Sequence, residues 1–197
     1  MSKLTRFNRL GFFLIAGVTL ITGFSANALQ KNTSLVQQLQ KTGKCVACDL
    51  SNANLANANL KGADLGRAVL SRANLKRVNL QRANLVLTAA NEVNFEGADL
   101  SFSDLPQAIL ISANLKNASF KNANLKAVDL ENANLENASL EGAVLERVNL
   151  AGANLTKANL QGAYLVGANL QGAKLKGANL KNANLRGAKM PDGKIHP

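Results

Sequence analysis

The sequence of 197 residues contains one histidine, His196, two cysteines and no tryptophan. With a single imidazole close to the end of the sequence, no Ser-His-Asp or Cys-His arrangement of catalytic side chains can be assembled. A zinc site needs several Cys or His ligands, and the sequence offers one C-x-x-C pair, Cys45 and Cys48, without a second pair. The sequence therefore predicts no enzyme activity, no metal site and no cofactor.

Long apolar runs are also scarce, and the one present lies near the start of the sequence, at Leu10–Phe24. At about 15 residues it is shorter than the ~20 residues that a transmembrane helix needs. Basic residues precede the run and Ala26-Asn27-Ala28 follows it, which is the pattern of a secretory signal peptide cut after Ala28. We expect residues 1–28 to be removed on export to a periplasm or thylakoid lumen, leaving a mature chain without a transmembrane segment.

What the sequence does contain is an apolar residue at every fifth position from Leu50 to Met190. This central residue is leucine except at Ala90, Phe95, Phe120 and Met190. The residue two places before the central one is small, usually alanine, and the residue directly before it is mostly Asn or Asp. Two corner residues after the central one complete each unit. A period of five fits neither a helix nor a continuous strand, so each unit must contain its own bend. The pattern predicts a solenoid with central and small residues pointing inward.

These A-[DN]-L-x-x units resemble the pentapeptide repeat family over most of the sequence. The resemblance implies an all-β fold, a single-stranded, right-handed quadrilateral β-helix with four units in each of about seven coils. The charges fit this arrangement, because residues twenty apart would stack and opposite charges recur at that spacing. Examples are the alternating series Lys76, Glu96, Lys116 and Glu136, and the pairs that Lys121 and Lys126 would form with Glu141 and Glu146.

The ends of the repeat region carry different signals. Asn32–Lys44 contains a possible capping box, Ser34 with Gln37, and a stop signal at Gly43, which predicts a short α-helix covering the first coil. Pro191-Asp192-Gly193 predicts a turn that ends the coils. We therefore expect a helical cap at residues 29–47, the β-helix at 48–190 and a tail at 191–197. Together with the C-x-x-C segment, these ends resemble exported cyanobacterial members of the family.

In the oxidising compartment that the signal peptide implies, Cys45 and Cys48 are expected to form a disulfide. By their phase in the repeat both side chains point into the first coil, so we interpret the bond as a staple between the helical cap and the rod. A redox-active dithiol is the alternative, although the Trp and Pro context of thioredoxin-like sites is missing.

The formal net charge is +11, and it falls to +8 once Lys3, Arg6 and Arg9 leave with the predicted signal peptide. Residues 29–85 hold nine basic and two acidic groups, residues 86–150 four and nine, and residues 151–197 seven and one. The rod should be basic at both ends and acidic at its waist. Arg67, Arg72, Arg77 and Arg82 fall at four different corners, so they form a collar and predict no specific nucleic-acid site.

A candidate interaction surface lies where apolar residues replace the polar residues expected on the outside. Its members are Val69, Val86, Leu87, Ile109, Ile111, Val144, Tyr164 and Val166, and Ala89 stacks between Val69 and Ile109. The alternative is a bulge within residues 86–95, where Thr88 and Ala90 underfill the core, that would bury Val86, Leu87 or Phe102.

Three functions remain open. The first is a structural or protein-interaction module that binds an unknown protein partner or a second copy of itself. The second is electrostatic binding of the basic ends to an anionic membrane or polymer. The third comes from the resemblance alone: DNA mimicry that modulates a type II topoisomerase. That role implies an acidic rod in the cytoplasm, whereas this chain is basic and predicted to be exported.

Overall fold

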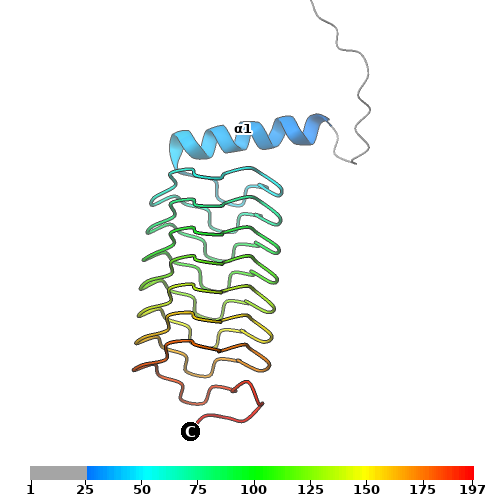
Figure 1. The fold of residues 1–197 in the computed structure, drawn as a ribbon. Coiled ribbons are helices and arrows are strands. Elements are labelled where there is room, and N and C mark those ends of the chain that lie inside the picture. The colour runs from blue at the N-terminus through cyan, green and yellow to red at the C-terminus, as the bar shows by residue number, and fades with distance from the viewer. Residues whose placement is uncertain (1–25) are drawn as a thin grey trace, which may run out of the picture.

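The computed structural model describes residues 26–197, which form one helix, α1 (Ala26–Thr42), followed by a stack of coils (Figure 1). Most of the predicted signal peptide lies outside the described residues, and the predicted cut after Ala28 falls in the first turn of α1. Within the described part of the chain, no helix is long and apolar enough to cross a membrane.

Helix α1 lies across the first coil as a lid (Figure 1). Its Leu39 is fully buried, and Leu35 and Val36 pack against the same core. The Asn32 Nδ2 atom donates a hydrogen bond of 2.8 Å to the Ser51 carbonyl of the first coil. The end of α1 at Thr42, followed by Gly43 with φ 68°, agrees with the prediction.

The predicted start of this helix is wrong. Helix α1 begins at Ala26, so Ser34 lies inside it and is not an N-cap. The physical reason is that Ala26–Lys31 is rich in Ala, Leu, Gln and Lys, residues that favour helix and offer no stop signal.

Each five-residue unit pairs with the unit twenty residues further on through an isolated parallel β-bridge, such as Asp49 with Val69. Three of the five backbone N–H groups in a unit bond to neighbouring coils: Leu50 N to Val69 O at 2.8 Å, Asn52 N to Ser71 O at 3.0 Å and Asn74 N to Ala53 O at 2.9 Å. Bridged units are therefore twenty residues, or four units, apart along the chain. The predicted solenoid is confirmed, and among the described residues its coils are held by single bridges without extended strands.

A tight turn at each corner bends the chain. The Ala53 N–H donates to the Leu50 carbonyl at 3.0 Å across the corner residues Ser51 and Asn52. The second corner residue has positive φ, for example 59° at Asn52 and 65° at Gly142, as the third residue of a type II turn requires. This left-handed position explains why glycine and asparagine gather there.

Central and small residues fill the interior. The repeat stays regular at residues 86–95, where a bulge was the alternative. Leu135 and Ala133 are completely buried, and Thr88 and Ala90 are at most 2% exposed. The Thr88 hydroxyl donates to the Leu85 carbonyl at 2.6 Å, so this polar residue needs no bulge to reach a partner. The bulge hypothesis is wrong, since Leu87 and Phe102 point outward with 43% and 56% of their surface exposed.

Cys45 and Cys48 form a disulfide, as predicted. The bond closes the first corner of the rod, because both cysteines follow the end of α1 at Thr42. Its interpretation as a staple between helix and rod is therefore wrong, and the lid is held by the Leu39 and Asn32 contacts instead. The first bridge, Lys44 with Asp64, also shows that the coils begin before residue 48.

Candidate interaction surface

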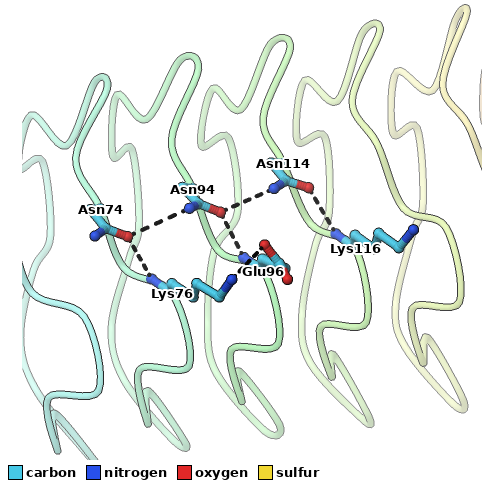
Figure 2. A network of polar contacts seen from close by, with 6 residues as sticks. All are labelled: Asn74, Lys76, Asn94, Glu96, Asn114 and Lys116. Atoms are coloured by element: carbon cyan, nitrogen blue, oxygen red, sulfur yellow. Dashed lines mark hydrogen bonds and ion pairs between the residues drawn. The ribbon is translucent and has the colours of Figure 1, made fainter.

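Asparagine at the position directly before the central residue of a unit has a structural role on the outside of the coils. The Asn94 Oδ1 atom accepts a hydrogen bond from the Glu96 N–H at 3.1 Å, which is the N–H of the first corner residue. The same atom accepts from Asn114 Nδ2 at 3.1 Å, and Asn94 Nδ2 donates to Asn74 Oδ1 at 3.5 Å (Figure 2). These side chains thus form a ladder along one face and satisfy the backbone donors beside them.

The neighbouring face breaks this ladder. Val69, Ala89 and Ile109 occupy the equivalent positions and bridge one another at the same spacing. Their side chains have no acceptor, so the N–H groups of Ser71, Asn91 and Ile111 lack the partner that asparagine supplies elsewhere. A hydrogen bond of this kind contributes about 0.5–1.5 kcal/mol. The face gives up this stabilisation and presents apolar surface, including Ile109 with 41% of its area exposed.

The adjoining corner extends the apolar surface. Val46, Val86 and Pro106 stack at intervals of forty and twenty residues along one corner, beside Leu87. Val46 is 54% exposed, and Leu87 points outward next to Ala89. We call the combined surface the apolar stripe; it comprises Val46, Val69, Val86, Leu87, Ala89, Pro106, Ile109 and Ile111.

A shallow hollow of about 310 Å³ lies at the edge of the apolar stripe. Its lining residues are Val46, Val86 and Leu87 of the stripe, together with Asp64, Gly66, Arg67 and Asn84. Gly66 opens its floor, since a Cβ atom at this position would meet Asn84 Nδ2 at 3.2 Å. The Asn84 amide is itself held by Asp64 Oδ1 at 2.8 Å. The hollow therefore combines three apolar side chains with the basic Arg67 and a fixed polar floor, which suits an inserted side chain of a partner.

The structure divides the eight predicted surface residues into two groups. Val69, Val86, Leu87, Ile109 and Ile111 belong to the apolar stripe, whereas Val144, Tyr164 and Val166 form a separate cluster further along the rod. The Lys126–Glu146 ion pair, at 3.2 Å, lies between them on the shared corner. Sequence reasoning missed Val46 and Pro106, although their spacing from Val86 by multiples of twenty would have placed them on that corner.

Four of the predicted charge pairs between coils are confirmed, whereas the Glu96–Lys116 step of the alternating series is not an ion pair among the described residues. Lysine Nζ and glutamate Oε2 lie 3.0–3.2 Å apart in four pairs: Lys76–Glu96, Lys116–Glu136, Lys121–Glu141 and Lys126–Glu146. Arg72 of the arginine collar also pairs with Glu92 at 3.1 Å, and hydrogen bonding to this carboxylate raises the pKa of the guanidinium. Such exposed pairs stabilise only weakly, so we interpret them as support for the stacking of coils.

These features define a solenoid of five-residue units with an exposed apolar surface on its side, a class of repeat protein built from stacked coils. The family model of pentapeptide repeats matches in eight copies, over residues 48–85, 91–126, 123–162 and 163–192. The chain belongs to the pentapeptide repeat family.

Solved structures of this family resemble the fold. HetL from the cyanobacterium Nostoc, a protein involved in regulating heterocyst differentiation, is 36% identical, with 78% of each chain covered and a TM-score of 0.63. QnrB1, a plasmid-mediated fluoroquinolone resistance protein, is 18% identical, with 76% of this chain and 84% of that chain covered and a TM-score of 0.59. The second likeness shows the fold alone. No curated protein matches the sequence.

Proposed function

We propose that this protein is a non-enzymatic interaction module that binds a protein partner through the apolar stripe, with the rod as its rigid support. The proposed support is a right-handed, quadrilateral β-helix of about seven coils. The observation that carries the proposal is the replacement of the asparagine ladder by Val69, Ala89 and Ile109. These residues give up hydrogen bonds to the corner N–H groups and present apolar surface instead, a combination that favours a binding role over a structural one.

We further propose that the protein acts after export to a periplasm or thylakoid lumen. The basic start, apolar run and Ala26-Asn27-Ala28 of the sequence support this location, and so does the disulfide between Cys45 and Cys48. Topoisomerase modulation is not supported, because the net charge is positive and the likeness to QnrB1 concerns the fold only.

Site-specific photo-crosslinking tests the proposed surface. A photoreactive residue replaces either Ile109 in the apolar stripe or Asn94 in the ladder, which occupies the matching position on the next face. In the cells of origin, we expect position 109 to crosslink to one defined protein, or to a second copy of the chain, and position 94 to crosslink to neither. Equal crosslinking from the two positions, or none from position 109, would rule out the apolar stripe as the binding surface.

A further inference from the structure

The two ends of the rod are finished differently. Helix α1 covers the first coil, whereas in the described part of the chain the last full coil is covered only on one side, by the folded-back C-terminal residues (Figure 1). Leu175, Leu180 and Leu185 of this coil are only partly buried. Their counterparts one turn earlier, Leu155, Leu160 and Leu165, are completely buried. The last coil therefore exposes the apolar residues that a further coil would cover.

The open coil also presents unused hydrogen-bond donors. In every preceding coil, the N–H groups of the central and second corner residues bond to carbonyls of the next coil, as Leu155 N does to Lys174 O at 2.9 Å. In the last coil the corresponding N–H groups have no protein acceptor among the described residues; they belong to Leu175, Gly177, Leu180, Asn182 and Leu185. Only one carbonyl per unit faces the same way, so this edge is rich in donors.

The end of the chain covers one side of this coil. Residues after the turn at Pro191-Asp192-Gly193 fold back, and Ile195 forms an antiparallel bridge with Lys189. The His196 N–H donates to the Ala188 carbonyl at 2.8 Å, and the Gly187 N–H donates to the His196 carbonyl at 2.9 Å. These contacts protect residues 187–190 and leave the edge from Leu175 to Leu185 free of the tail.

Positive charge surrounds the open edge. Residues 174–194 carry six basic groups, Lys174, Lys176, Lys181, Arg186, Lys189 and Lys194. The one acidic residue among them is Asp192, which pairs with Lys194 at 3.5 Å. Lys176 and Lys181 are exposed corner residues directly beside the unused N–H groups.

We propose that the open C-terminal coil binds an extended, acidic segment of a protein partner by β-strand addition. Carbonyls of that segment would accept hydrogen bonds from the N–H groups along one side of the coil, those of Gly177, Leu180 and Asn182. An apolar side chain of the segment would cover Leu180, and its carboxylates would lie near Lys176 and Lys181 at the two corners of that side. A second copy of this chain fits poorly, because a symmetric pairing of two such ends would place donors against donors and cations against cations.

This surface lies at the end of the rod, so the proposal does not depend on the apolar stripe. The two surfaces can be tested separately, because substitutions at Ile109 leave the open coil unchanged.

Peptide binding to the 197-residue chain tests the proposal. The probe is a short fluorescent peptide of alternating glutamate and valine, and the control peptide has lysine in place of glutamate. We expect fluorescence anisotropy to detect binding of the acidic peptide only. NMR amide exchange should then show protection of Gly177, Leu180 and Asn182, with the first coils unchanged.

A matched pair of variants locates the site. Lys181 and Lys61 are exposed corner residues at the same corner, at opposite ends of the rod. We expect Lys181→Glu to weaken binding of the acidic peptide about three- to tenfold, and Lys61→Glu to change it less than about twofold. Both substitutions are on the surface and should leave thermal unfolding unchanged.

Any of the following results would overturn the proposal. The first is equal weakening by Lys61→Glu and Lys181→Glu. The second is peptide binding without protection of the amides at the open coil, or displacement of the peptide by a single-stranded oligonucleotide that itself protects them. The third is a peptide-free dimer, detected by sedimentation, in which these same amides are already protected from exchange.

Discussion

Two neighbouring faces of the rod have the same backbone and different side chains. On one face Asn74, Asn94 and Asn114 form a ladder that satisfies the corner N–H groups (Figure 2). On the other, Val69, Ala89 and Ile109 occupy the same positions and provide no acceptor. The backbone bridges continue through both faces, so asparagine is not required for the coils to form. The ladder resumes further along the same face, where Asn149 donates to Asp129 and Asn169 donates to Asn149. Its loss at three consecutive positions is therefore a local sacrifice of stability, which is the pattern expected of a functional surface.

The largest effect on stability is expected inside the coil, where the side chains of the two faces are of the same kind. Leu135→Asp would place a carboxylate in a position that is now completely buried, without a partner, and should cost several kcal/mol or raise the pKa of the new carboxyl until it is neutral. Glu136→Ala, one residue away, removes a half-exposed ion pair with Lys116 and should cost less than about 1 kcal/mol. Thermal unfolding compares the two variants; equal effects would contradict the assignment of inward and outward positions.

The next effect concerns the ladder. Asn94→Ala removes the acceptor of the Glu96 N–H and breaks the contacts to Asn74 and Asn114. We expect a loss of about 1–2 kcal/mol in the free energy of unfolding, measured by urea denaturation. An unchanged unfolding midpoint would mean that water replaces the asparagine without cost. The ladder would then not stabilise one face relative to the other.

The sequence predicted the repeat, the inward residues and the charge pairs because each depends on one regular spacing. It did not reveal the ladder, since the hydrogen bond from Glu96 N to Asn94 depends on the conformation of the corner. The start of α1 was misplaced because Ser34 can cap a helix but does not have to. The apolar stripe was only partly predicted: Val46 lies before the first leucine of the repeat, and its place on the corner follows from the coils beginning at Lys44.

The reverse substitution in the apolar stripe should stabilise the rod. Ala89→Asn would supply an acceptor for the Asn91 N–H, although Val69 and Ile109 offer no ladder contacts to the new side chain. We therefore expect a gain of about 0.5–1 kcal/mol, smaller than the loss at Asn94, together with weaker partner binding. Urea denaturation measures the first effect. A destabilised Ala89→Asn variant would show that this face has an energetic role of its own.

A smaller effect is expected at Asp99, where a carboxylate replaces the asparagine of a ladder position. Burial disfavours its charge, but hydrogen bonds from Ser101 and Gln81 outweigh this and lower the pKa of Asp99. Because the pKa is lower in the folded state, the stabilisation is present above the ordinary Asp pKa and is lost as pH falls through the folded value. The unfolding temperature of Asp99→Asn should therefore fall slightly less with falling pH than that of the unsubstituted chain. Identical pH profiles would contradict a contribution of Asp99 to stability.

The proposed binding role is tested most directly by replacing Ile109 with asparagine and Ile111 with lysine in one variant. Both side chains contribute to the apolar stripe, whereas Glu131→Lys, at the corner position one coil beyond Ile111, is a control that changes charge without removing apolar surface. Affinity for the protein that crosslinks through position 109 is measured for each purified, folded variant. We predict at least a tenfold loss, about 1.4 kcal/mol or more, for the double variant and little change for Glu131→Lys. A folded double variant that binds the partner as tightly as the unsubstituted chain would contradict the account.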